Sequence, residues 1–164
     1  QTCALPISNY GSEIFTVEYR KKFKNEFPVR KPLAFREFLN IYKQENVYLD
    51  SAFPQNSAMM KDIFLPSILN CHEIWSTIDN LNLLFNGGEA NSAFHHDGLE
   101  NIITVVSGSK KVYLVNSTYA KELHADQFTI APGVLSIDPE KLDLEMYPKL
   151  ADVPYYEVTL NRGK

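Results

Sequence analysis

Apolar and polar residues alternate over several short stretches of the N-terminal half, and this alternation predicts β-strands. The predicted strands are Ile14–Tyr19, Val47–Leu49 and Leu81–Phe85. Between the first two, apolar residues recur at helical spacing from Leu33 to Gln44, so we expect a helix there. A second short helix is expected to begin at Ser57, whose side chain would cap it, and to end near Ile63.

The C-terminal half is richer in strand patterns. The predicted strands are His95–Asp97, Leu99–Ser107, Lys110–Val115 and Tyr155–Leu160. Gly108-Ser109 separates two of them and is typical of a type II′ hairpin turn, whereas Asp143–Tyr147 favours one helical turn. Helices followed by many short strands predict a mainly β protein with N-terminal helices, folded as a barrel or jelly roll.

The strongest chemical signal is a histidine and a carboxylate two residues apart. His95 and Asp97 would point to the same side of an extended strand, because side chains alternate with period two. This pair supplies two of the three protein ligands in the facial triad of non-haem Fe(II) oxygenases. The parity places His96 on the opposite, solvent side, and polar surroundings indicate that His72 and His124 are surface residues.

The predicted hairpin places Lys110 on the same sheet face as Ile103 and Val105. His95 and Asp97 share that face if the chain does not bulge between the strands. A lysine that points into a barrel is costly unless it meets an anion, such as a metal-bound dicarboxylate. The alternative is that Lys110 extends into solvent at the end of the hairpin.

Composition supports one globular domain: the 164 residues are 45% hydrophobic and 12% aromatic. The formal charge is −4, and no run of Lys and Arg is long enough to indicate a nucleic-acid track; the densest, Arg20–Lys24, is interpreted as a solvated turn or strand edge. No apolar run is long enough for a membrane span. We expect residues 1–8 to be a non-native or disordered leader and residues 9–164 to form one partial domain.

Several motifs at characteristic spacings resemble one family. They are Gly87-Gly88, Ser92–Asp97, Glu100–Ile102, Ser107–Lys110 and Tyr156–Leu160 with Gly163. Together they resemble the JmjC (cupin-like) Fe(II)- and 2-oxoglutarate-dependent oxygenases, most closely the small hydroxylase branch, over most of residues 29–164. The resemblance implies a double-stranded β-helix, which is a jelly roll of the cupin type.

The resemblance also implies roles for six residues. His95 and Asp97 match the first two iron ligands, and Lys110 matches the lysine that binds the distal carboxylate of 2-oxoglutarate. The other co-substrate contacts would come from Ser92, Asn101 and Tyr48. After the glycine matched by Gly163, the family continues into a strand and a turn that carry the distal histidine. We therefore expect a domain incomplete at its C-terminus, without the third ligand and inactive by itself.

The function implied for the intact parent is hydroxylation of a protein or peptide side chain, in which 2-oxoglutarate is converted to succinate and CO₂. The alternatives are a non-catalytic cupin-fold binding module and a tRNA-modifying hydroxylase, although the acidic balance disfavours nucleic acid. A homodimer of the intact protein stays open. Cytoplasm or nucleus is the favoured compartment, and the secretory pathway stays open because the chain begins at Gln1.

Overall fold

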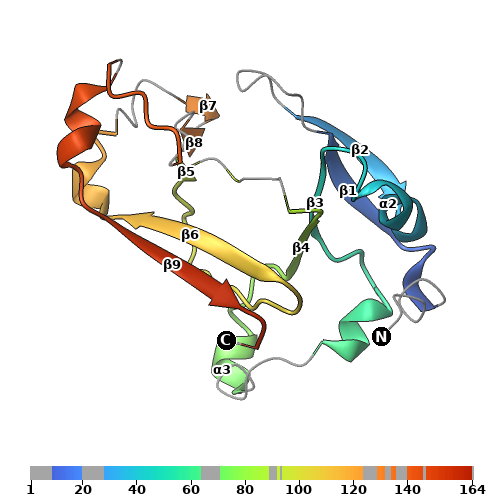
Figure 1. Cartoon of the computed structure of the whole chain (residues 1–164). Helices are drawn as coiled ribbons and strands as arrows, with labels where there is room; N and C mark the ends of the chain where they lie inside the picture. The colour runs from blue at the N-terminus through green and yellow to red at the C-terminus, as the bar shows by residue number, and fades with distance from the viewer. Residues whose placement is uncertain are drawn as a thin grey trace. The chain divides into compact units, whose positions relative to one another are not determined.

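The computed structural model describes most of the chain as two compact units, residues 1–91 and 92–164 (Figure 1). The described residues are 9–19, 28–63, 71–88, 92, 94–123, 129–131, 134–135, 140–145 and 147–163. The expected leader, residues 1–8, and the basic run Arg20–Lys24 lie outside these ranges.

The first unit contains a four-stranded antiparallel sheet with the strand order β2-β1-β3-β4. The strands are β1 (Ile14–Tyr19), β2 (Val29–Ala34), β3 (Val47–Ala52) and β4 (Asn82–Asn86). Three of them confirm predicted strands, but β2 was not predicted because its sequence lacks clear alternation. Pro32 has no N–H to donate, and it is accommodated because β2 is the edge strand of this sheet.

Helix α2 (Phe35–Ile41) follows β2 directly and covers this sheet (Figure 1). The predicted start at Leu33 was therefore two residues early, because Leu33 and Ala34 pair with β1 instead. The first turn is secured by Glu37, whose carboxylate accepts a hydrogen bond from the Ala34 N–H at 3.3 Å. The core between helix and sheet consists of Phe15, Val17, Phe35, Phe38, Val47 and Leu49.

A short 3₁₀ helix, η1 (Met59–Asp62), replaces the helix expected to begin at Ser57. Its cap is Glu13, whose Oε1 accepts the N–H groups of Ala58 and Met59 at 2.9 and 3.2 Å. Ser57 donates its hydroxyl to the same carboxylate, so the prediction that Ser57 caps this helix was wrong. The stronger acceptor comes from a residue more than forty positions away, which local sequence patterns do not reveal. Helix α3 (His72–Trp75) lies later in this unit.

The second unit contains two small antiparallel sheets. One has the order β5-β8-β7, and its strands are β5 (Phe94–His95), β8 (Val134–Leu135) and β7 (Thr129–Ala131). The other pairs β6 (Ser109–Val115) with β9 (Tyr155–Asn161), which lie side by side in Figure 1. Both predicted strands in this second sheet are confirmed.

The predicted hairpin was wrong. Residues 101–105 have no strand conformation, and β6 pairs with β9, so that Lys110 lies opposite Leu160. Gly108 does adopt the positive φ, 78°, that a turn glycine favours. Pairing between strands whose residues are forty or more positions apart in the sequence replaces the local hairpin. The N–H of Gly163 also donates to the Val105 carbonyl at 3.1 Å.

A small local core in the second unit lies around the segment just before β9. Leu150, in the 3₁₀ helix η4 (Pro148–Asp152), is buried against Phe94, Leu123, Tyr147 and Val153. The expected helical turn before η4 is present, because the Tyr147 N–H donates to the Asp143 carbonyl at 2.8 Å. A second 3₁₀ helix, η3 (Ser117–Tyr119), follows β6. Within the described ranges, no helix combines the length and apolarity needed to cross a bilayer.

Candidate metal centre

The predicted ligand pair meets at the end of β5. His95 is the last residue of this strand and lies opposite Val134, whereas Asp97 follows just beyond the strand end. The His95 Nε2 and the Asp97 Oδ2 are 3.6 Å apart. The imidazole nitrogen and the carboxylate oxygen approach each other although the strand predicted over His95–Asp97 ends at His95. The roles of both residues as iron ligands stay predictions.

The distance and the donor types fit a shared first-row metal ion. Two donors each about 2.1 Å from one ion lie no more than about 4.2 Å apart, and 3.6 Å is within that limit. Both side chains are about half exposed, at 44% and 50%, so an ion can reach them. In the described part of the chain, no group of three or more His, Cys, Asp or Glu residues is placed to hold a metal, so His95 and Asp97 are described as a candidate pair.

Asn101 completes this cluster. The chain bends at Gly98 and Leu99 instead of continuing as a strand, and the bend brings Asn101 back to the ligand pair. Its Nδ2 donates to the Asp97 Oδ2 at 2.7 Å. The carboxylate oxygen that faces His95 thus also accepts a hydrogen bond from an amide.

Lys110 lies near the start of β6 and is half-buried. Its sheet face is shared with Val112 and Leu114 on the same strand, and with Leu160 and Val158 on β9. This apolar surrounding replaces the face predicted from the hairpin. The sequence argument required Lys110 to lie on an apolar sheet face, where an anion is a favourable partner, and the pairing with β9 meets this requirement.

The remaining predicted residues lie in different places. Ser92 is exposed and precedes His95 by three residues, in the second unit. Tyr48 lies in β3 of the first unit, opposite Glu18 on β1, and is only 2% exposed. Their roles as co-substrate contacts stay predictions. His72 and His96 are exposed, as expected, whereas His124 lies outside the described residues.

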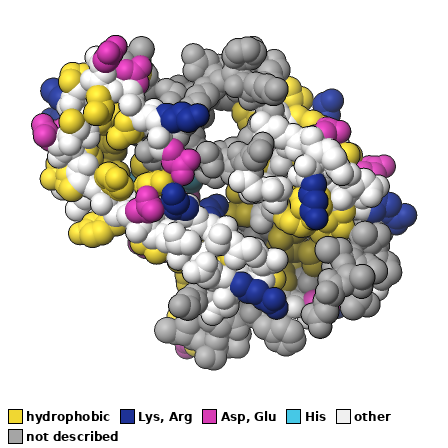
Figure 2. Space-filling model, in the orientation of Figure 1, with side chains coloured by type: hydrophobic (Ala, Val, Ile, Leu, Met, Phe, Trp, Pro, Cys, Tyr) yellow, Lys and Arg dark blue, Asp and Glu magenta, His cyan; other side chains and the backbone are white. Residues whose placement is uncertain are grey.

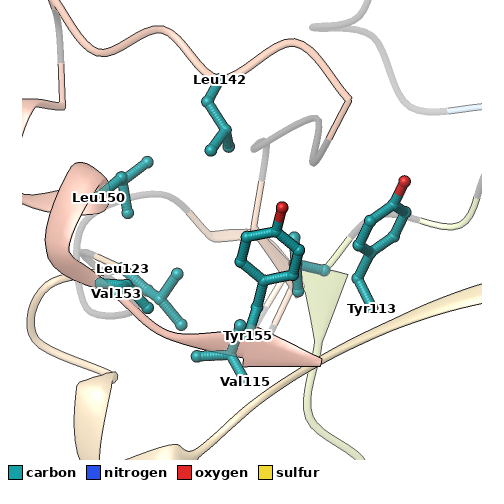
Figure 3. A pocket seen from close by; sticks show the side chains of 8 residues that line it. Tyr113, Val115, Leu123, Leu142, Leu150, Val153 and Tyr155 are labelled. Atoms are coloured by element: carbon teal, nitrogen blue, oxygen red, sulfur yellow. The ribbon is translucent and has the colours of Figure 1, made fainter. Parts of the chain in front are cut away.

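A small apolar hollow in the second unit is a separate feature (Figure 3). Its volume is about 30 Å³. The residues around it are Phe94, Tyr113, Val115, Leu123, Leu142, Leu150, Val153 and Tyr155. Phe94 and His95 point to opposite sides of β5, so the hollow is a gap in the local core and not part of the metal centre.

A charged cluster that the sequence did not reveal lies on the other face of the β6–β9 pair. The Lys111 Nζ is 3.5 Å from a Glu140 oxygen and 3.8 Å from a Glu157 oxygen. A hydrogen bond with Tyr113 and the charge of Glu157 raise the pKa of Lys111 above its usual value. Desolvation raises the pKa of the Tyr113 hydroxyl as well. Odd and even positions of β6 thus point to opposite faces, which separates this cluster from Lys110.

Comparison with known proteins places the chain in a family. The sequence profile described as "Cupin-like domain" matches residues 10–164 and so spans both units. The chain belongs to this family. The expected cupin-like JmjC domain is confirmed, and the antiparallel sheets agree with its jelly-roll fold. Members of the JmjC family use Fe(II) and 2-oxoglutarate, which are the expected cofactors.

Three relatives show moderate similarity. "Lysine-specific demethylase JMJ31" of Arabidopsis thaliana is 30% identical over 80% of this chain, and "Lysine-specific demethylase JMJ30" of the same plant is 25% identical over 94%. "Jumonji C domain-containing protein 5" of Drosophila melanogaster is 27% identical over 68%. The chain spans only 22%, 37% and 28% of the lengths of these three relatives, respectively.

Proposed function

We propose that the protein containing this chain is an Fe(II)- and 2-oxoglutarate-dependent oxygenase that hydroxylates a protein side chain. The observation that carries the proposal is the approach of the His95 Nε2 to the Asp97 Oδ2, 3.6 Å apart at the end of β5, in a chain of the cupin-like family. An imidazole and a carboxylate two residues apart are the expected first two members of a facial triad.

The chain's own residues divide the work of the site. His95 and Asp97 would hold the metal, which supplies the site for O₂ activation when bound. The ammonium of Lys110 would hold the distal carboxylate of 2-oxoglutarate, assisted by Ser92. Lys110 is half-buried, and its ammonium would make a charge-assisted contact with that carboxylate.

The test is 2-oxoglutarate turnover by a polypeptide extended downstream through the family's distal strand. We expect succinate release above background with Fe(II), 2-oxoglutarate and O₂, and a return to background in His95→Ala and Asp97→Ala. Lys121→Met is the control, because Lys121 is exposed and follows the end of η3. An extended protein that binds iron but releases no succinate would instead support the non-catalytic binding module.

Lysine demethylation is the second candidate, because two of the relatives are named lysine-specific demethylases. Hydroxylation of an N-methyl carbon yields a hydroxymethyl amine, which releases formaldehyde and leaves the free amine. Methyl-lysine peptides that release formaldehyde would favour this reaction. Peptides that gain one oxygen atom and release no formaldehyde would favour stable hydroxylation.

A tRNA substrate is less well supported by the surface charges. The chain has a formal charge of −4, and on the face shown in Figure 2 the basic and acidic side chains of the described residues are interspersed. Tight binding of RNA phosphates needs several clustered cations. Turnover stimulated by tRNA and by no peptide would overturn the choice of a protein substrate.

A further inference from the structure

Asn101 contacts the carboxylate of the candidate metal ligand directly. Its Nδ2 lies 2.7 Å from the Asp97 Oδ2, the same oxygen that lies 3.6 Å from the His95 Nε2. A carboxylate oxygen has two lone pairs, so the bond from Asn101 leaves one lone pair of this oxygen and the whole of the other oxygen for a metal ion.

Asp97 needs such support because β5 ends at His95. Among the described residues, no sheet pairing holds the backbone of Asp97, and its side chain is half exposed. An exposed carboxylate that is not held samples several rotamers, and fixing one of them on metal binding costs conformational entropy. The bend at Gly98 and Leu99 places the Asn101 amide where it can fix the carboxylate in advance.

We infer that Asn101 is a positioning residue for Asp97: its amide holds the carboxylate facing His95 before the metal binds. This inference rests on the proposed function, because it assumes that His95 and Asp97 bind a metal. It differs from the role that the family resemblance implies for Asn101, which is to lie beside the co-substrate. The two roles predict different effects on metal and co-substrate binding.

The experiment measures Mn²⁺ affinity in the absence of 2-oxoglutarate, and then 2-oxoglutarate affinity at saturating Mn²⁺, in the full-length protein. We expect Asn101→Ala to weaken Mn²⁺ binding about 10- to 100-fold, the usual effect of removing a hydrogen-bond partner of a metal ligand. The Mn²⁺ electron paramagnetic resonance spectrum should also change, because the carboxylate is no longer held in one orientation.

The chain offers a matched control. Asn80 donates its Nδ2 to the Asp79 Oδ2, also at 2.7 Å and on an exposed surface, but in the other unit, which holds neither proposed metal ligand. Asn80→Ala removes the same kind of amide–carboxylate bond and should leave Mn²⁺ affinity unchanged. A similar loss in both variants would show that the effect is not specific to the metal centre and would overturn the inference.

A double-mutant cycle separates positioning from a general structural role. If Asn101 acts through Asp97, then adding Asn101→Ala to Asp97→Ala causes no further loss of the residual Mn²⁺ affinity. Additive losses would overturn the inference, as would an Asn101→Ala variant that binds Mn²⁺ normally but 2-oxoglutarate weakly. Failure of the wild-type protein to bind Mn²⁺ would overturn the proposed function together with this inference.

Discussion

At the scale of single residues, the candidate site depends on side chains that meet across short stretches of sequence. His95, Asp97 and Asn101 lie within seven positions and form one cluster through contacts of 3.6 and 2.7 Å. Other residues have effects that only close packing reveals. A Cβ on Gly87 would lie 2.3 Å from the Tyr42 carbonyl oxygen, so no larger residue fits there without a backbone shift.

Gly87→Ala should therefore lower the free energy of unfolding, by about 1–3 kcal/mol, because the new methyl group collides with backbone and not with a flexible side chain. Urea denaturation followed by circular dichroism measures the change. Gly98→Ala is the matched control, since nothing lies within 4 Å of the position that a Cβ would take there, and its stability should be unchanged or raised by up to about 1 kcal/mol. Equal stability of both variants would contradict the assigned packing at Gly87.

Lys110 is expected to determine co-substrate affinity. Lys110→Met keeps most of the apolar stem but removes the charge, so we predict that the KM for 2-oxoglutarate rises about 10- to 100-fold in the extended protein, as for loss of a hydrogen bond to a charged group. Metal affinity should stay the same. An unchanged KM for 2-oxoglutarate would favour the alternative in which the Lys110 side chain only extends into solvent.

At the scale of elements, the pairing of β6 with β9 separates two chemical environments. One face carries Lys110 among apolar side chains, and the other carries Lys111 and Tyr113 near Glu157. The N-terminal sheet shows a similar division of roles, because edge strand β2 is mostly exposed whereas β1 and β3 supply the core. In the β6–β9 pair the two faces differ, whereas in the N-terminal sheet the edge strand differs from the inner strands.

The Lys111–Tyr113 pair should make stability fall at alkaline pH. Both pKa values are raised in the folded state, from 10.5 for Lys111 and 10.0 for Tyr113. Protons therefore leave these groups more easily in the unfolded chain, and the stabilisation present below pH 10 is lost as the pH rises through the folded pKa values. Thermal melts between about pH 9 and about pH 12 should show a melting temperature that declines as the pH rises. The decline should be shallower in Lys111→Met/Tyr113→Phe.

The control for this decline is Lys121→Met/Tyr119→Phe, which changes the same residue types at and just after the end of η3. It should follow the wild-type pH profile. The effect is expected to be small because Lys111 is 45% exposed and its ion pairs compete with water. Identical profiles for all three proteins would contradict a linked contribution from this cluster.

At the scale of the whole molecule, one family match covers two compact units. The second unit contains the candidate ligands and Lys110, whereas the first contains Tyr48 and the larger aromatic core. The apolar face around Lys110 includes strongly exposed residues, among them Tyr156 at 74%. Among the described residues, the second unit has the smaller buried core, so its stability is expected to depend on ligands more than that of the first unit.

Metal binding should consequently raise the melting temperature of the extended protein. A ligand at 100 times its Kd stabilises the folded state by about 2.7 kcal/mol, which corresponds to a rise of several degrees. We predict this rise with Mn²⁺ and 2-oxoglutarate, its loss after chelation with EDTA, and its absence in His95→Ala. A rise of equal size in His95→Ala would show that the ions stabilise the protein at another site.

The sequence by itself determined the strand segments β1, β6 and β9 and the mainly β class, because period-two alternation acts locally. The two-residue spacing also keeps the candidate ligands His95 and Asp97 close together. Tertiary structure alone decided that β9 and not residues 99–107 pairs with β6, that Glu13 caps η1, and that the chain bends to bring Asn101 onto Asp97. Each of these outcomes is a competition between partners for the same backbone or carboxylate groups. Which partner wins depends on distances through space that no local pattern of residues encodes.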